Sequence, residues 1–293
     1  MNSIELKSRA KINLSIDVLG KRDDGYHLVE MIMQTIDLYD VIKIKQLDTN
    51  DVVIKSNSSH IPLDNDNIVY KAIELLRQRF NINKGIEVFI EKNIPVAAGM
   101  AGGSSNAAAV LVGLNKLWKL NLTEQELQEL GLKLGADVPY CISGKTALAE
   151  GIGEKLSYIK GLPKNISILI CKPNLFVSTK DVYQGLDLNN IENRPNNKLL
   201  IECLEKGDID SLSKNMSNVL ENVTSKIHKE INEIEEIMMA NSALGSMMSG
   251  SGPTVFGLFD KSENALKCKD ILLQQYSQVY VVSSSEKGVE ICG

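Results

Sequence analysis

The amino-acid sequence predicts an α+β protein of two domains, with α/β as the alternative class. Segments with the two-residue period of strands interleave with segments of helical period, and no internal repeat or low-complexity tract separates them. The 293 residues suffice for two hydrophobic cores. Turn-forming residues from Lys160 to Asn165 place a boundary near residue 155, which gives expected domains of 1–155 and 156–293.

The first half is expected to contain five strands and three helices. The strands are predicted at 4–7, 11–18, 40–46, 51–55 and 86–91, with a polar turn over 20–30 and with 51–55 paired to 40–46. A helix over 65–80 carries apolar residues on one face, and an alanine-rich helix follows the glycine-rich segment after residue 95. Thr123 and Glu126 form a capping box that begins a third helix, which ends at Gly135.

The second half is expected to continue the same interleaving. Strands are predicted at 146–150, 155–158, 166–171 and 279–283, with one more beside a Gly/Ser loop over 249–259. A polar loop is expected from 172 to 197. Helices are predicted at 202–205, 209–219 and from 263, and the spacing of Ile227, Ile231, Ile234 and Met238 indicates one buried helical face.

Composition excludes several classes of function. The net charge of −5, the pI near 5.4 and an aromatic content of 5% argue against a nucleic-acid partner. The five scattered cysteines and three histidines show no zinc-binding spacing. The cysteines are expected to be free thiols in a reducing cytoplasm, and the N-terminal segment lacks the pattern of a signal peptide. Two uncharged stretches, 93–115 and 237–259, contain too many Pro, Gly, Ser and Asn residues for membrane spans, and we predict that they form paired loop segments near a polar ligand.

The segment PVAAGMAGGSSNAAAVL, residues 95–111, has the composition of an anion-binding loop. It connects a predicted strand to a predicted helix, and Gly99, Gly102 and Gly103 allow a tight turn or a close approach to a ligand. Unpaired N–H groups at the start of the helix favour phosphate. Many glycine-containing turns between a strand and a helix bind nothing, so the loop by itself leaves both interpretations open.

Four other features have a functional and an ordinary interpretation. Lys11 lies in a predicted strand with apolar neighbours and could be a solvated surface lysine. Asp137 precedes Val-Pro and could be a turn residue that bonds its own backbone. Tyr26 and His27 could be turn residues, and the Ser-Gly-Ser-Gly segment at 249–252 a simple connector.

Together and in this order, these segments resemble the GHMP kinase superfamily, over almost the whole chain. Residues 95–105 are similar to its phosphate-binding motif, and 249–252 to its C-terminal glycine motif. Within it, the segments AKINL at 10–14, RDDGYH at 22–27 and GADVP at 135–139 resemble the kinases that act on cytidine-diphosphate-linked methylerythritol. The resemblance implies a two-domain fold, with an N-terminal ATP-binding domain similar to a ribosomal protein domain and a C-terminal ferredoxin-like α/β sandwich.

The resemblance also implies an activity and a set of site residues. The γ-phosphate of ATP would pass to the C2 hydroxyl of 4-diphosphocytidyl-2-C-methylerythritol in the non-mevalonate isoprenoid pathway, with Asp137 as general base and Lys11 beside it. Asn13 would contact substrate near Lys11. Tyr26, His27, Thr179 and Tyr183 would bind the cytidine. The implied ATP site consists of Asn67, Pro95, Val96, Ala97, Ala98, Gly99, Met100, Ala101, Gly102, Gly103, Ser104 and Ser105.

Two departures from the family pattern give further expectations. Ala101 stands where the family usually has glycine, so we predict a negative φ at this residue. Tyr140 stands where Phe or Ala is usual, and we expect no effect on either substrate site. Mg²⁺ is expected with ATP; no protein carboxylate is assigned to it, and Ser105 is the best candidate ligand.

The competing interpretations are another GHMP kinase and a non-catalytic nucleic-acid-binding protein. A mevalonate or homoserine kinase would share the ATP loop but would lack the cytosine site that Tyr26 and His27 suggest. The acidic pI argues against the nucleic-acid interpretation. The expected partners are small-molecule substrates, and the sequence is compatible with a monomer or a homodimer.

Overall fold

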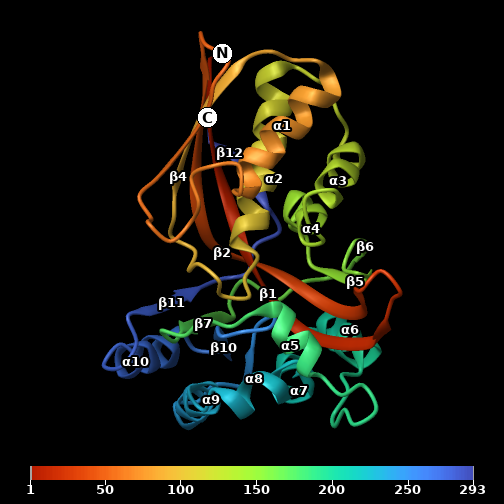
Figure 1. Ribbon diagram of the computed structural model, residues 1–293. Helices are drawn as coiled ribbons and strands as arrows, with labels where there is room; N and C mark the ends of the chain where they lie inside the picture. Colours follow the sequence, from red (N-terminus) through yellow and green to blue (C-terminus); the bar gives the residue numbers. More distant parts are fainter. Residues whose placement is uncertain (1, 293) are drawn as a thin grey trace.

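The computed structural model describes residues 2–292 and contains two β-sheets flanked by helices (Figure 1). The α+β prediction is confirmed. An eight-stranded sheet has the central order β12-β1-β2-β4-β3, and in addition β5 pairs with β2, β6 with β5 and β8 with β1. Its strands are β1 (Ser3–Lys21), β2 (His27–Leu47), β3 (Val52–Ser56), β4 (Gly85–Glu91), β5 (Ala147–Gly151), β6 (Lys155–Tyr158), β8 (Ser217–Asn218) and β12 (Val289–Cys292).

The second sheet is antiparallel and has four strands in the order β11-β7-β10-β9. These are β7 (Ser167–Lys172), β9 (Gly245–Met248), β10 (Val255–Phe259) and β11 (Gln278–Val282). Helices α9 and α10 pack on it, as Figure 1 shows. The helices of the second half are α5 (Thr179–Gly185), α6 (Asn197–Lys206), α7 (Ile209–Asn215), α8 (Glu221–Ile227), α9 (Glu230–Ala240) and α10 (Ser262–Leu272).

One helix, α2, is central to the first half of the chain. It packs on β1 and β2 and against α1 and α4, and the alanines of its buried face allow this close packing. The helices here are α1 (Ile68–Phe80), α2 (Gly102–Trp118), α3 (Glu124–Leu132) and α4 (Val138–Ser143). The capping box of Thr123 and Glu126 is confirmed at the start of α3. No helix within residues 2–292 has both the length and the apolarity that a bilayer crossing needs.

The strand β1 contributes to two environments at once. Its residues Ala10, Ile12 and Leu14 are fully buried in the hydrophobic cluster that also contains Ile168 and Ile170 of β7. Successive side chains on a strand point to opposite faces, so the residues between these three point away from the second sheet. The two sheets therefore share a core through β1, and the other face of β1 is free to carry polar groups.

Several predicted elements differ from the observed ones. The strands expected at 4–7 and 11–18 form one continuous strand, β1. Its pairing with β2 continues past the polar residues near its middle, with three local shifts of register. The polar turn is shorter than expected, because His27 already begins β2. The strand β3 pairs in parallel with β4, whereas pairing with residues 40–46 was expected.

Short elements and one helical face were also predicted incorrectly. The polar loop expected up to residue 197 contains α5, and α4, α8, β8, β9 and β12 were not predicted because so few residues carry no clear period. Ile227 ends α8 with 69% of its surface exposed, whereas Ile231, Ile234 and Met238 of α9 are buried as expected. The helix break at His228 and Lys229 separates the two groups.

Segments of the second half also complete the first sheet. The strand β8 pairs in parallel with β1 at Ser15 and Ile16, and β12 pairs antiparallel with the other end of β1. The chain passes from β6 in the first sheet to β7 in the second between residues 158 and 167. The boundary near residue 155 stays a prediction.

Two largely buried carboxyl groups, those of Glu221 in α8 and Glu235 in α9, interact near the end of β9. The backbone N–H of Met248 donates to Oε2 of Glu221 at 2.7 Å. Burial raises the pKa of Glu221, and burial together with the charge of Glu221 raises the pKa of Glu235. Oε1 of Glu235 has no hydrogen-bond partner in the part of the chain that the structure describes.

We expect Glu235→Gln to stabilise the protein at neutral and alkaline pH. Above the ordinary glutamate pKa of 4.5 the unfolded chain releases the proton while the folded pair retains it, so the free energy of unfolding of the wild type falls as pH rises. The free energy of unfolding of the variant should fall less over the same pH range, and at pH 8 it should exceed that of the wild type by about 1 kcal/mol or more. Urea unfolding at pH 5 and pH 8 measures this, and an equal pH dependence in both proteins would contradict it.

Candidate active site

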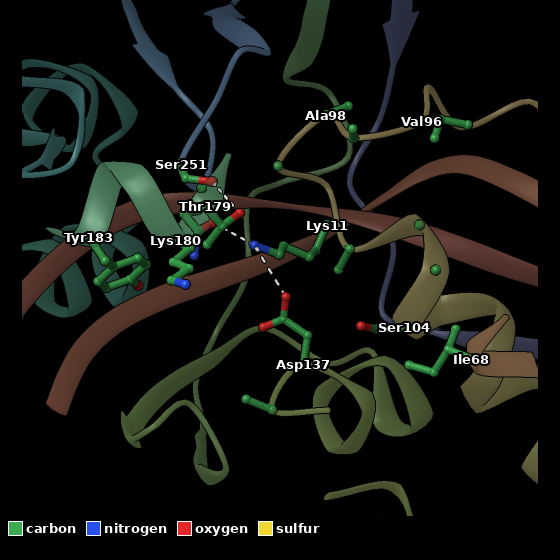
Figure 2. Close-up of a pocket in the computed structure, with 18 of the residues that line it drawn as sticks. Lys11, Ile68, Val96, Ala98, Ser104, Asp137, Thr179, Lys180, Tyr183 and Ser251 are labelled. Carbon is green, nitrogen blue, oxygen red and sulfur yellow. Dashed lines mark hydrogen bonds and ion pairs between the residues drawn. The ribbon is translucent and has the colours of Figure 1, made fainter. Parts of the chain in front are cut away.

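A single cavity of about 1060 Å³ gathers most of the predicted site residues (Figure 2). Its wall consists of β1, the turn before β2, the glycine-rich loop, the start of α4, α5 and the loop after β9. Met100 and Ser105 do not line it, because both are buried beneath the loop. The predicted residues that line it are Lys11, Asn13, Tyr26, His27, Asn67, Pro95, Val96, Ala97, Ala98, Gly99, Ala101, Gly102, Gly103, Ser104, Asp137, Thr179 and Tyr183.

Lys11 and Asp137 form an ion pair inside this cavity. Nζ of Lys11 lies 4.0 Å from Oδ2 of Asp137 and donates to Oδ1 of Asn13 at 2.7 Å. Lys11 is only 5% exposed, so the alternative of a solvated surface lysine is wrong. Asp137 occupies the N-cap position of α4 but makes no capping hydrogen bond, so its carboxylate faces Lys11 rather than its own backbone. The two side chains approach each other from separate elements, as Figure 2 shows.

The glycine-rich loop leaves the N-terminus of α2 open toward the cavity. Ala101 is the N-cap residue and makes no side-chain capping bond, so the N–H groups of the first turn remain available to an anion. Its φ is +55°, and the negative φ expected for Ala101 is therefore wrong. Hydrogen bonds on both sides fix this conformation: Lys11 N donates to Met100 O at 3.2 Å, and Ser105 N to Ala101 O at 2.8 Å.

The two uncharged segments are in contact through a loop of each, although the prediction that they are loops throughout is wrong, because most of their residues belong to α2, α9, β9 and β10. Oγ of Ser249 donates to the carbonyl of Gly99 at 3.2 Å. A Cβ on Gly99 would lie 2.3 Å from the carbonyl oxygen of Ser249, and one on Gly250 would lie 2.7 Å from the carbonyl oxygen of Gly99. Both glycines also have positive φ. The pairing of the two segments is confirmed, and glycine is required on both sides.

Two aromatic rings form the opposite end of the cavity. The rings of His27 and Tyr183 lie 4.9 Å apart with an interplanar angle of 34°. Burial, and then the nearby charge of Lys21, lower the pKa of His27, so its imidazole is neutral at pH 7. Thr179 at the start of α5 shares a 2.8 Å hydrogen bond with Ser251. Tyr26 is 57% exposed at the rim.

Three further residues of the sequence analysis have defined positions. Oγ of Ser105 is fully buried and donates to Arg9 O at 2.7 Å, so Ser105 does not fit a metal ligand. Asn67 caps α1, with Oδ1 accepting from Val69 N, although its side chain borders the cavity. The hydroxyl of Tyr140 is buried 3.0 Å from Thr35 Oγ1, away from the cavity wall.

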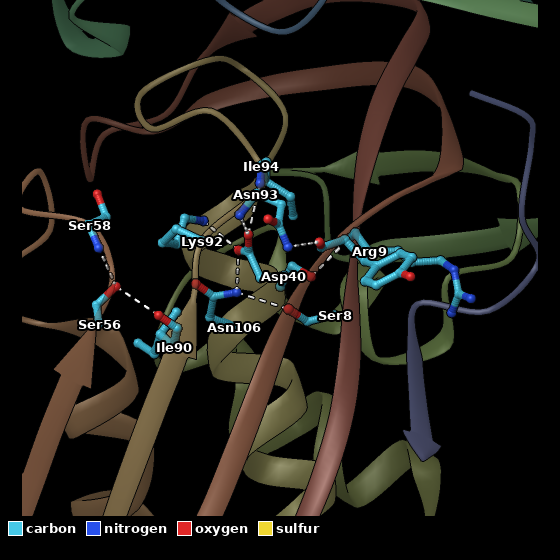
Figure 3. A network of polar contacts seen from close by, with 12 residues as sticks. Ser8, Arg9, Asp40, Ser56, Ser58, Ile90, Lys92, Asn93, Ile94 and Asn106 are labelled. Atoms are coloured by element: carbon cyan, nitrogen blue, oxygen red, sulfur yellow. Dashed lines mark hydrogen bonds and ion pairs between the residues drawn. The ribbon is translucent and has the colours of Figure 1, made fainter. Parts of the chain in front are cut away.

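A buried polar network that the sequence analysis missed supports the glycine-rich loop (Figure 3). Asp40 is completely buried and forms an ion pair with Lys92, whose side chain borders the cavity. Asp40 also accepts from the backbone N–H groups of Asn93 and Ile94 at 2.7 and 2.8 Å, and from Nδ2 of Asn106 at 2.7 Å. It therefore joins the residues before the loop to α2 after it. In the sequence Asp40 is only the first, polar residue of the strand predicted at 40–46, and nothing there indicates its burial.

Comparisons with known proteins agree with this geometry. Residues 67–145 match the model of the GHMP kinases N terminal domain, and residues 200–278 that of the GHMP kinases C terminal. The chain is 71% identical over its full length to a curated 4-diphosphocytidyl-2-C-methyl-D-erythritol kinase of Clostridioides difficile strain 630, and the match covers 99% of that protein. It is 53% identical to the kinase of the same name from Alkaliphilus oremlandii, over 99% of this chain and 100% of that one.

The chain belongs to the 4-diphosphocytidyl-2-C-methyl-D-erythritol kinase family of GHMP kinases. A solved 4-(cytidine 5'-diphospho)-2C-methyl-D-erythritol kinase superimposes with a TM-score of 0.81 at 28% identity, over 96% of this chain and 99% of that one. A solved homoserine kinase of Cytophaga hutchinsonii also superimposes with a TM-score of 0.81, at 20% identity, over 100% of this chain and 98% of that one. The shared backbone therefore confirms the GHMP kinase fold, and sequence identity distinguishes the family within it.

We expect Asp40→Ala to destabilise this kinase strongly. The variant leaves the ammonium of Lys92 buried without its partner and removes the acceptor for two backbone N–H groups, which should cost about 3–5 kcal/mol. Asp40→Asn keeps an oxygen for the backbone and should cost less. Urea unfolding measures both, with Glu87→Ala in the more exposed Lys55–Glu87 ion pair as a control costing about 1 kcal/mol or less. Equal losses in Asp40→Ala and Glu87→Ala would contradict this role.

We expect Ala101→Gly to be neutral or stabilising. A left-handed alanine costs about 1–2 kcal/mol, and the greater freedom of glycine in the unfolded chain offsets part of the relief. The free energy of unfolding should therefore rise by up to about 1 kcal/mol. Thermal unfolding tests this, and a marked loss of stability would show that the Ala101 methyl group makes packing contacts worth more than the backbone strain.

Proposed function

We propose that this protein transfers the γ-phosphate of ATP to the C2 hydroxyl of 4-diphosphocytidyl-2-C-methyl-D-erythritol. The observation that carries the proposal is the position of the Lys11–Asp137 pair in one cavity with the open N-terminus of α2 and with the His27–Tyr183 ring pair. A nucleoside triphosphate and a cytidine-bearing alcohol can therefore bind on either side of a lysine and a carboxylate. Mevalonate or homoserine would leave the ring pair without a role.

The phosphate chain of ATP is assigned to the glycine-rich loop. The N–H groups of the first turn of α2 and the positive end of its dipole favour the phosphates. The loop backbone is held from below by Asp40 and from the side by Ser249. Such fixed donors act by pre-organisation, because they need little rearrangement when charge develops on the transferring group.

The cytosine ring is assigned to the end of the cavity formed by His27 and Tyr183. A neutral imidazole can donate from one nitrogen and accept at the other, which suits the edge of cytosine, where an amino donor lies beside ring and carbonyl acceptors. Tyr183 offers a face for stacking, with Tyr26 at the rim and Thr179 at the start of the same helix. These assignments rest on the aromatic geometry and on the family.

The chemistry at Lys11 and Asp137 is assigned to positioning and charge. Asp137 would accept the proton of the C2 hydroxyl, while the Lys11 ammonium would orient that oxygen and offset charge on the phosphoryl group. Asn13 accepts a hydrogen bond from Lys11 and so directs the ammonium. Because phosphoryl transfer has a loose transition state, the proton can leave late, and position matters more than the strength of the base.

Mg²⁺ fits this cavity as an ion carried mainly by ATP. No group of three His, Cys, Asp or Glu side chains that could hold a metal occurs among residues 2–292. The hydroxyl of Ser104 borders the cavity beside the α2 N-terminus, so Ser104 replaces Ser105 as the candidate ligand. Bound with ATP, Mg²⁺ would neutralise part of the charge of its phosphates. We further propose a cytoplasmic enzyme acting as a monomer or homodimer on these two small molecules.

The decisive experiment compares phosphoryl acceptors. ATP-dependent ADP release should occur with 4-diphosphocytidyl-2-C-methyl-D-erythritol and not with mevalonate or homoserine. Turnover of either alternative without turnover of the cytidine compound would reject the proposal.

We expect Lys11→Ala to impair catalysis more than Asp137→Asn. Loss of Lys11 removes both the orienting donor and the offsetting charge, which should lower kcat about 10²- to 10³-fold. Asp137→Asn keeps a hydrogen-bond acceptor and should retain measurably more activity. Steady-state kinetics measure both. If Asp137→Asn is the less active variant, the result contradicts this order and indicates that proton removal limits the rate.

We expect His27→Ala to lose discrimination between cytosine and uracil. The wild type should prefer the cytidine substrate over its uridine analogue, and the variant should raise the KM for the cytidine substrate and narrow this preference by about tenfold or more. The KM for ATP is the internal control. A variant with the wild-type preference would exclude His27 as the residue that recognises the base.

A further inference from the structure

Two lysines of the cavity have no acidic partner. Four lysines line it, namely Lys11, Lys21, Lys92 and Lys180. Lys11 is paired with Asp137, and Lys92 with Asp40. Among the residues that the structure describes, neither Lys21 nor Lys180 forms an ion pair. An unpaired cation in a concave site is a candidate for binding an anionic part of a ligand.

Both lysines lie beside the aromatic end of the cavity. Lys21 is the last residue of β1 and is directly opposite His27 in the β1–β2 register. Its charge contributes to the lowered pKa of His27, after the larger effect of burial. Lys180 precedes Tyr183 by three residues on α5, and side chains at this spacing share a helix face.

The helix α5 directs Lys180 toward the reacting groups. In Figure 2 Lys180 and Tyr183 extend from this helix toward the space that Lys11 and Asp137 enter from other elements. The hydrogen bond between Thr179 and Ser251 ties the start of α5 to the loop after β9. The position of Lys180 is therefore fixed relative to the loop after β9, which in turn contacts the glycine-rich loop through Ser249 and Gly99.

We propose that Lys21 and Lys180 form a subsite for the diphosphate of the cytidine-bearing substrate. The inference rests on the proposed function, in which the base lies at His27 and Tyr183 and the hydroxyl lies at Lys11 and Asp137. The diphosphate connects these two parts, so it must cross the space between them. It carries two negative charges there, and two cations without partners border that space.

The subsite determines specificity rather than chemistry. Both lysines are exposed at the cavity rim, so their ammonium groups remain partly hydrated and salt screens them. They select a nucleoside that carries phosphate over one that does not. Lys11 stays the cation at the transferred phosphoryl group, because it is buried and already directed by Asn13.

Binding of two simple probes tests this subsite without any turnover. CDP and cytidine are titrated calorimetrically against the wild type, Lys21→Met, Lys180→Met and the double variant. Each single substitution should weaken CDP binding about three- to tenfold and leave cytidine binding nearly unchanged. Higher salt should weaken CDP binding to the wild type more than to the double variant. Lys164→Met, at an exposed lysine outside the cavity, serves as the matched control and should match the wild type.

Each result has one meaning. If the ratio of CDP to cytidine affinity is the same in the wild type and the double variant, or if both ligands weaken equally, the subsite is rejected. In the kinase assay the KM for the cytidine substrate should rise in both single variants, with the KM for ATP unchanged. Absence of any turnover of that substrate would reject the proposed function, whereas the ratio of CDP to cytidine affinity would still decide the role of the lysines.

Discussion

The alternation of side chains along β1 is the constraint on which both the fold and the cavity depend. Ala10, Ile12 and Leu14 enter the core shared with the second sheet, so Lys11 and Asn13 must lie on the other face. Burial of the apolar set holds the strand in place far more strongly than the polar groups could. Since a one-residue slip would exchange the two sets, the hydrophobic core also fixes the register of Lys11.

The second constraint is the close approach of two loops. Gly99 and Gly250 lie so near each other's backbones that neither position has space for a Cβ. This contact brings the loop after β9, which belongs to the second half of the chain, against the glycine-rich loop of the first. The buried Asp40 and Lys92 fix the same loop from the opposite side. The glycine-rich loop is thus held by both halves of the molecule, although only the first half supplies its sequence.

The sequence allowed the longer elements and the list of cavity residues to be predicted, because each depends on local pattern or on a recognisable family motif. The sequence failed where the outcome depends on distant contacts. Ala101 adopts a left-handed conformation because the backbone N–H groups of Lys11 and Ser105 donate to the carbonyl groups of Met100 and Ala101. The contact with Lys11 is distant in the sequence, so local residue preferences do not predict it. Asp40 is a polar residue at the start of a predicted strand, and its burial depends on the packing of distant elements around it. Ser105 has a suitable hydroxyl for a metal ligand, but this hydroxyl donates to the carbonyl of Arg9, which is distant in the sequence.

The charges of the cavity are divided by function. The side chains of Lys11 and Lys92 are buried, and each has a carboxylate beside it, so their positions are fixed before a substrate arrives. Lys21 and Lys180 are exposed and unpaired in the described chain, so they can gain an anionic partner only from a ligand. Buried, compensated cations suit the step in which charge develops, because they need no reorganisation. Exposed, uncompensated cations suit capture of the substrate, because they attract its phosphates over a longer distance. Under the proposed function, this division would allow a protein with a net charge of −5 to bind two polyphosphate compounds in one cavity.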